Sequence, residues 1–252
     1  MELLQFALIG IALGLSLGLF GGGGGILAVP LLVAAGIPAD EAGTTSLVVV
    51  GIGAVGGLLP HARAGRVAWR EGVLFSALGA VGAIAGSKLA LFTEDRIQLW
   101  GFTVVLIVAG SLMLRNALRT QHGGTPHPDR RRRSWWLVVP TALTVGLFTG
   151  FFGVGGGFLV VPALALVMGM TMYQATATAL LVITLNSAVA LIPRAGEALD
   201  MTATAVVAGF VLLSSALAAR WSNRWSERSL GIGFAGLVLA MSLLAMAQAS
   251  AA

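Results

Sequence analysis

The stretch GLFGGGGGILAVP, at residues 18–30, occurs a second time as GFFGVGGGFLVVP at residues 150–162. Both copies place a run of glycines inside a long apolar segment, where glycine destabilises a helix. Matching interruptions in two halves of a hydrophobic chain are typical of transporters whose midplane binding site is built from discontinuous helices. The repeated motif therefore predicts two broken helices that meet at one site.

The composition indicates a membrane protein. Hydrophobic residues make up 57% of the chain and charged residues only 10%, whereas soluble domains carry roughly 25% charged residues. The net charge is +5, but the arginines gather in short clusters between apolar stretches, as in cytoplasmic loops. We therefore expect a lipid bilayer as the surroundings and no nucleic-acid partner. The absence of cysteine excludes disulfides and thiolate chemistry.

Apolar stretches of about 17 to 25 residues predict transmembrane helices. In the first half they cover residues 3–20, 42–59, 73–92 and 97–118, with a short apolar piece at 26–35. In the second half they cover residues 135–152, 175–192, 202–219 and 229–247, with a short piece at 158–168. We expect an all-α integral membrane protein of about eight segments. Its parts are repeat 1 (1–118), an arginine-rich linker (119–134) and repeat 2 (135–252).

The two halves align well beyond the glycines. Thr45 aligns with Thr178 and Pro60 with Pro193, while Arg96 aligns with Arg228. One extra residue after Pro162 moves the offset between the halves from 132 to 133. This register predicts an internal duplication.

The distribution of charge predicts that the two repeats are inverted. Suppose that each half contains one V-shaped helix pair, which enters and leaves the membrane on the same side, and three full spans. The chain then crosses the membrane an odd number of times in each half, so the second half lies inverted relative to the first. One side then collects most of the arginines, including the linker run 130–133, and the other side keeps only Lys88, Arg96 and Arg194. The positive-inside rule puts the arginine-rich loops and the linker in the cytoplasm. If each short apolar piece instead dipped into the membrane and returned without forming a V with the preceding segment, the odd number of crossings would be lost. The arginines would then divide between both faces.

A helix that begins inside a membrane exposes unpaired N–H groups and a positive dipole end. An anion is the usual ligand of such an end, and glycine lets it approach the backbone. The alternative is that the glycines only allow close packing, which we assign to Gly53-x-x-x-Gly57 and Gly82-x-x-x-Gly86. A phosphate-binding loop is not indicated, because no Lys-Ser/Thr follows the glycines.

Hydroxyl and amide side chains near the breaks are further candidates for the site. Threonine in a membrane helix also bonds its own backbone, and Asn186 could serve in a site or in a buried interhelical bond. The predicted substrate-binding residues are Gly21, Gly22, Gly23, Gly24, Gly25, Thr44, Thr45, Ser46, Gly153, Gly155, Gly156, Gly157, Thr176, Thr178, Asn186 and Ser187.

The interiors of the predicted spans are poor in groups that could carry protons. We expect His61 in a loop and no acidic residue or histidine firmly inside a span. No carboxylate relay for proton coupling is visible, so coupling to a proton or another ion is left open, as is the oligomeric state. We expect no cofactor, no metal and no catalytic residue, because no nucleophile–base pair or metal cluster lies at membrane depth.

The twin motifs, each followed by a glycine and a threonine-bearing span, resemble the TauE/SafE sulfite exporter family. The segment G-x-F-G-V-G-G-G-F at residues 150–158 is similar to the family pattern, whereas the first copy departs from it by having glycine where other members often have another residue. The resemblance implies a bacterial inner-membrane transporter that exports sulfite or an organosulfonate. Uptake of a sulfur compound, a passive anion channel and a membrane scaffold that transports nothing are the alternatives.

Overall fold

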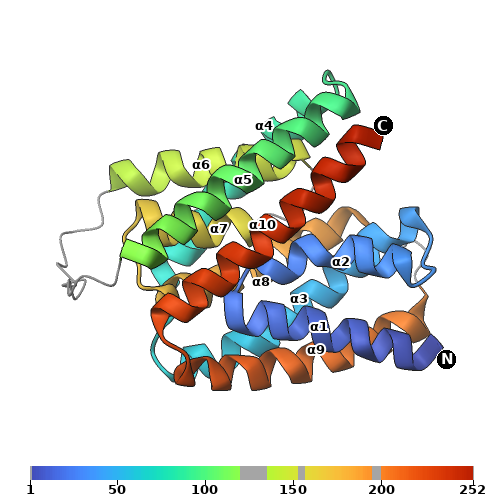
Figure 1. Cartoon of the computed structure of the whole chain (residues 1–252), viewed down its shortest axis with the longest axis horizontal. Helices are drawn as coiled ribbons and strands as arrows, with labels where there is room; N and C mark the ends of the chain where they lie inside the picture. Colours follow the sequence, from blue (N-terminus) through green and yellow to red (C-terminus); the bar gives the residue numbers. More distant parts are fainter. Residues whose placement is uncertain (1, 120–134, 153–156, 195–199, 252) are drawn as a thin grey trace.

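The computed structural model describes residues 2–119, 135–152, 157–194 and 200–251, and these residues are almost wholly helical. The first half contains α1 (Glu2–Phe20), α2 (Gly23–Ala34), α3 (Ala39–Arg63), α4 (Trp69–Ala90) and α5 (Asp95–Arg119) (Figure 1). The second half contains α6 (Trp135–Phe152), α7 (Gly157–Pro162) with a π-helical turn (Ala163–Val167), α8 (Met172–Leu191), α9 (Met201–Trp221) and α10 (Glu227–Ala251). Short 3₁₀ turns follow α8 (Ile192–Arg194) and α9 (Ser222–Arg224).

Seven of the described helices are long and apolar enough to cross a membrane, namely α1, α3, α4, α5, α8, α9 and α10. The shorter apolar helices are α2, α6 and α7 with its π-helical turn. The protein is therefore an all-α membrane protein, as the apolar stretches predict.

The first glycine motif makes a tight turn between α1 and α2. Gly21 has φ +71°, a left-handed conformation that glycine adopts without strain, and Gly22 precedes the first residue of α2. We expected the break to extend to Gly25, but Gly23 to Gly25 are helical. There, glycine serves close packing, because a Cβ at Gly23 would lie 2.6 Å from the Ser16 hydroxyl oxygen. Helix α2 returns beside α1 (Figure 1).

The extra residue of the second half lies in the π-helical turn after α7. There the Met168 N–H donates to the Ala163 carbonyl oxygen at 3.2 Å, a bond across five residues. A π-helical turn holds one residue more than an α-helical turn. It therefore absorbs the insertion that shifts the offset between the halves.

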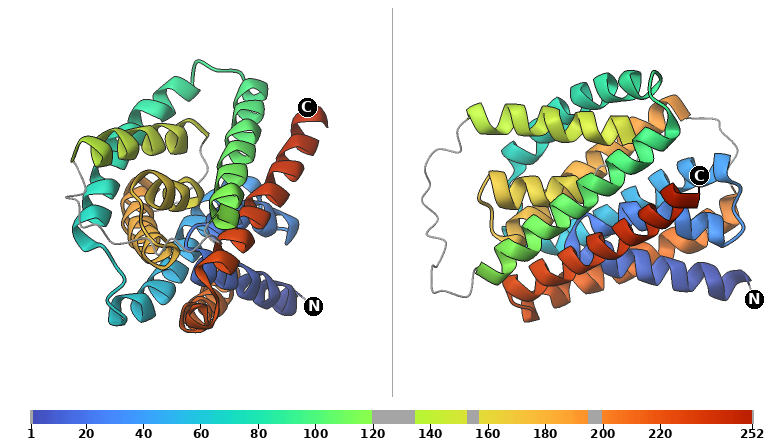
Figure 2. Two further views of the ribbon diagram at one scale, coloured as in Figure 1. Left: turned by 60° about the vertical axis from the view of Figure 1, so that its left-hand side comes forward. Right: turned by 45° about the horizontal axis from the view of Figure 1, so that its top comes forward.

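Glycines bring helices of different halves together. Helix α1 packs along α9, and α4 packs along α6 (Figure 1 and Figure 2). Added Cβ atoms at Gly82 and Gly86 would overlap the carbonyl oxygens of Leu143 and Leu147. The Gly82-x-x-x-Gly86 pair is thus a packing motif, as the sequence predicts.

Corresponding helices of the two halves run antiparallel where they touch. Gly57 of α3 lies against Leu180 of α8, and Gly51, earlier in α3, lies against Ser187, later in α8. The same order holds for α5 and α10, because Gly110 meets Leu239 and Gly231 meets Ala117.

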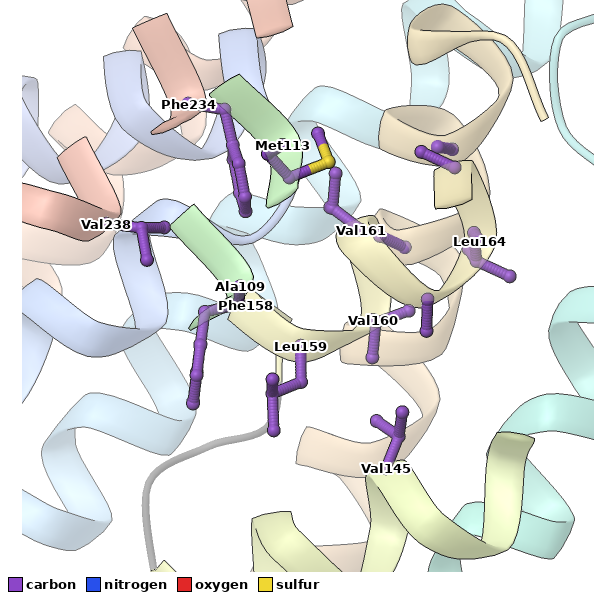
Figure 3. Packing of buried hydrophobic residues seen from close by; sticks show 14 of the residues in the cluster. Ala109, Met113, Val145, Phe158, Leu159, Val160, Val161, Leu164, Phe234 and Val238 are labelled. Carbon is purple, nitrogen blue, oxygen red and sulfur yellow. The ribbon is translucent and has the colours of Figure 1, made fainter. Parts of the chain in front are cut away.

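Helix α7 lies in the interior of the protein. All six of its residues are buried, and Figure 3 shows Phe158 and Val161 among side chains of α5 and α10, such as Met113 and Phe234. Because its neighbours shield it from the surroundings, the second glycine motif ends in a protected position.

Candidate substrate site at the paired glycine motifs

The two glycine motifs meet in the structure. A Cβ at Gly22 would overlap the Gly157 carbonyl oxygen and would lie 3.2 Å from the Phe158 Cα atom. Gly157 in turn packs on Ile183, which lies close to the middle of α8. Residues far apart in the chain are therefore brought together inside the protein. The predicted site residues Gly153, Gly155 and Gly156 lie outside the described residues.

The start of α2 supplies hydrogen-bond donors at this junction. The first N–H groups of a helix have no intrahelical partner, and Gly22 has no side chain with which to cap them. The positive end of the helix dipole lies at the same place. Gly23, Gly24 and Gly25 are thus the predicted residues whose backbone could bind an anion.

Two residues with buried hydroxyls, Ser16 and Thr176, pack against this turn. The Ser16 oxygen faces Gly23, and the Thr176 Cγ2 atom would lie 2.9 Å from a Cβ at Gly21. Ser16 is 5% exposed and Thr176 1% exposed. Neither hydroxyl has a hydrogen-bond partner among the residues that the structure describes. Ser16 is a residue that the sequence reasoning missed, because a serine in an apolar span carries no signal of its own.

The other predicted hydroxyls differ in what they contact. Thr45 is fully buried, and its hydroxyl also has no partner in the described part of the chain. Ser46 donates to the Gly43 carbonyl oxygen at 2.7 Å. Thr44 accepts from Arg194 at 2.9 Å, and Thr178 accepts from the Ala68 N–H at 3.1 Å, just before α4 begins. Ser46, Thr44 and Thr178 thus already hold helices or side chains in place.

Asn186 forms a bond between helices. Its Oδ1 accepts from the Ser76 hydroxyl at 2.5 Å, which joins α8 to α4. Of the two roles open to it, the structure shows the interhelical bond. Ser187 lies against Gly51 in the contact between α8 and α3. No described contact brings either residue to the Gly22–Gly157 junction.

The expectation that His61 lies in a loop is wrong. Helix α3 continues through Pro60 to Arg63, because the packed helices of a membrane protein tolerate an internal proline. His61 is only 1% exposed, and neither ring nitrogen has a partner among the described residues. The alignment of Pro60-His61 with Pro193-Arg194, a basic residue after a proline in both halves, is the sequence signal that could have revealed it.

Comparison with known proteins gives one family and several transporters. Residues 6–245 match the family described as "Sulfite exporter TauE/SafE". A "Probable membrane transporter protein" of Xylella fastidiosa (strain Temecula1) is 37% identical over 172 residues, which cover 68% of this chain and 65% of that protein. The "Probable membrane transporter protein YunE" of Bacillus subtilis is 27% identical over 74% of this chain and 76% of its own length.

A third relative is the "Probable membrane transporter protein YfcA" of Escherichia coli K12, which is 31% identical over 63% of this chain and 57% of its own length. The chain thus spans about two thirds of the length of the Xylella relatives that it matches. No solved structure matches the chain.

Proposed function

Because this chain belongs to the TauE/SafE family of membrane proteins, we propose that it is a secondary transporter of a small sulfur-containing anion. Sulfite or an organosulfonate is the substrate that the family description favours, and export is the direction. The observation that carries the proposal is the contact between the turn at Gly22 and Gly157, with the start of α2 and two unpartnered buried hydroxyls beside it.

The chemistry of this junction suits a compact oxyanion. Sulfite and sulfonates offer several oxygen acceptors, which match the N–H groups of Gly23 to Gly25 and the hydroxyls of Ser16 and Thr176. Binding by neutral donors also permits release, which a transporter needs as much as binding.

We further propose that the two halves form an inverted repeat and that alternating access moves helices around the junction. The antiparallel contacts of α3 with α8 and of α5 with α10 support this arrangement. The reciprocal pairing of α1 with α9 and of α6 with α4 supports it as well. With the arginine-rich loops in the cytoplasm, the start of α1 would lie on the outer side.

The first test is thermal stabilisation of the purified protein by a panel of ions. The panel contains sulfite, sulfate, thiosulfate, sulfoacetate, taurine, phosphate, acetate and, as a cation, Mn²⁺. A ligand at a hundredfold excess over its Kd raises the stability of the folded state by about 2.7 kcal/mol. A shift with sulfite or a sulfonate supports the proposal, whereas no shift with any anion favours the scaffold that transports nothing.

Flux measurements in proteoliposomes separate the remaining alternatives. Transport of the stabilising anion that saturates with concentration supports a transporter, and a rate that rises without saturation indicates a channel. Loading the anion on one side at a time then distinguishes export from uptake.

A further inference from the structure

The residue that the proposed site leaves unused is His61. It is buried near the end of α3, and its ring lies beside the backbone of Gly18, the first residue of the glycine motif. The Gly21 N–H donates to the Leu17 carbonyl oxygen at 2.8 Å, so Gly21 continues the path of α1 and lies three residues, or about 4.5 Å along the axis, beyond Gly18. A titratable side chain therefore lies beside the glycine motif that leads into the predicted anion site.

The position that corresponds to His61 in the second half holds a permanent cation. Arg194 follows Pro193 as His61 follows Pro60, and its Nη1 donates to the Thr44 hydroxyl at the start of α3. Because α3 and α8 run antiparallel, these two basic residues lie at opposite ends of the helix pair. One end of the pair thus has a fixed charge, and the other has a charge that depends on pH.

We propose that His61 takes up one proton when the anion binds at the start of α2, so that anion and proton are loaded together. This inference rests on the proposed function. The neutral imidazole has one N–H, and its second ring nitrogen accepts a proton from water. The resulting imidazolium gives this proton back to water when the anion leaves. No redox step is involved.

Electrostatics favour this coupling. An anion buried alone in a low-dielectric interior is costly, and a nearby positive charge offsets much of the cost. The imidazole is also costly to charge alone, because it is buried. An anion bound nearby offsets part of this cost. Each charge therefore stabilises the other, which is thermodynamic coupling.

The other titratable groups near His61 leave it as the residue that changes charge. From α8 comes Tyr173, whose ring lies under Arg66 at 4.7 Å, and from α9 comes Arg220, which is exposed. Helix α1 carries only Glu2, at its far end, and α2 carries no titratable residue. Histidine is the residue among these that ordinarily titrates between about pH 5 and 8.

The test is anion binding as a function of pH, using the full chain in detergent. Methanesulfonate and sulfate are the probes, because neither changes its own charge between about pH 5 and 8. One linked proton raises Kd about tenfold per pH unit above the titration of the free imidazole. We expect His61→Gln to bind with a Kd that does not change with pH. His122→Gln, in the linker between the halves, is the matched control and should behave as the wild type.

Two further measurements keep the test decisive. If His61→Gln does not fold, His61→Asn replaces it. Independently of any variant, wild-type protein titrated with methanesulfonate in weakly buffered solution should take up about one proton per bound anion. Binding without proton uptake, or a slope that persists in His61→Gln, overturns the role of His61 but leaves the anion site intact. Failure of the wild type to bind either probe at any pH overturns the proposed site and this inference together.

Discussion

At the scale of single residues, the structure separates hydroxyls that the sequence could not distinguish. Thr178 accepts a backbone hydrogen bond, whereas Thr176, two residues earlier on the same helix, has no partner among the described residues. Their neighbours along the chain are similar, so only the arrangement of surrounding helices decides which hydroxyl is used. The residue types at the site were predictable, but the allocation of their bonds was not.

This pair of threonines gives a direct prediction. Thr176→Val should leave the free energy of unfolding nearly unchanged, because the hydroxyl has no bond in the described structure to lose. It should weaken anion binding about tenfold or more, the effect of one hydrogen bond to a charged ligand. Thr178→Val should instead destabilise the protein by about 1 kcal/mol, through the lost bond at the start of α4, and leave the Kd unchanged. Thermal melts with and without sulfite measure both effects, and equal behaviour of the two variants would contradict the assignment.

Gly22 should tolerate no side chain. A valine there would overlap the Gly157 backbone, and overpacking of this kind costs about 1–3 kcal/mol. We expect Gly22→Val to lower Tm and to abolish stabilisation by the anion. The control is Gly236→Ala in α10, where an added Cβ meets nothing within 4 Å. A Gly22→Val protein that still responds to the anion would place the site elsewhere.

At the scale of helices, the sequence predicts most of the structure and misses details that depend on packing. The apolar stretches locate the long helices to within a few residues, because lipid demands long apolar helices. The end of α3 was missed, since Pro60 suggests an end that neighbouring helices make unnecessary. Gly23 and Gly24 are helical for a similar reason, because close contact with α1 compensates for their weak helix propensity.

The bond between α4 and α8 should contribute to stability. Ser76→Ala removes the donor to Asn186 and leaves a partly buried amide oxygen without it, which costs about 1 kcal/mol or more. Ser87→Ala in the same helix is the control, because Ser87 is exposed and donates to the Ile84 carbonyl oxygen of its own helix. Chemical or thermal unfolding should show a larger loss of stability for Ser76→Ala than for Ser87→Ala. Equal stabilities would show that the interhelical bond contributes nothing.

At the scale of the whole molecule, the halves are interleaved. Helix α1 of the first half packs along α9 of the second, and α6 of the second packs along α4 of the first. The sequence predicts the duplication but not this exchange, because spacing along the chain does not say which helices touch. Because glycines bring these backbones into direct contact, we expect the bodies that move during transport to contain helices from both halves.

The orientation of this interleaved molecule can be tested by labelling, because the chain contains no cysteine. Leu91, between α4 and α5, is 82% exposed, and Asn223, between α9 and α10, is exposed as well. If the arginine-rich loops are cytoplasmic, Leu91→Cys should react with a membrane-impermeant maleimide in intact cells. Asn223→Cys should react only after the cells are permeabilised. The reverse pattern would turn the molecule over and place the His61 end of α3 outside. Reaction of both positions in intact cells would contradict the single-sided distribution of arginine on which the inverted repeat was predicted.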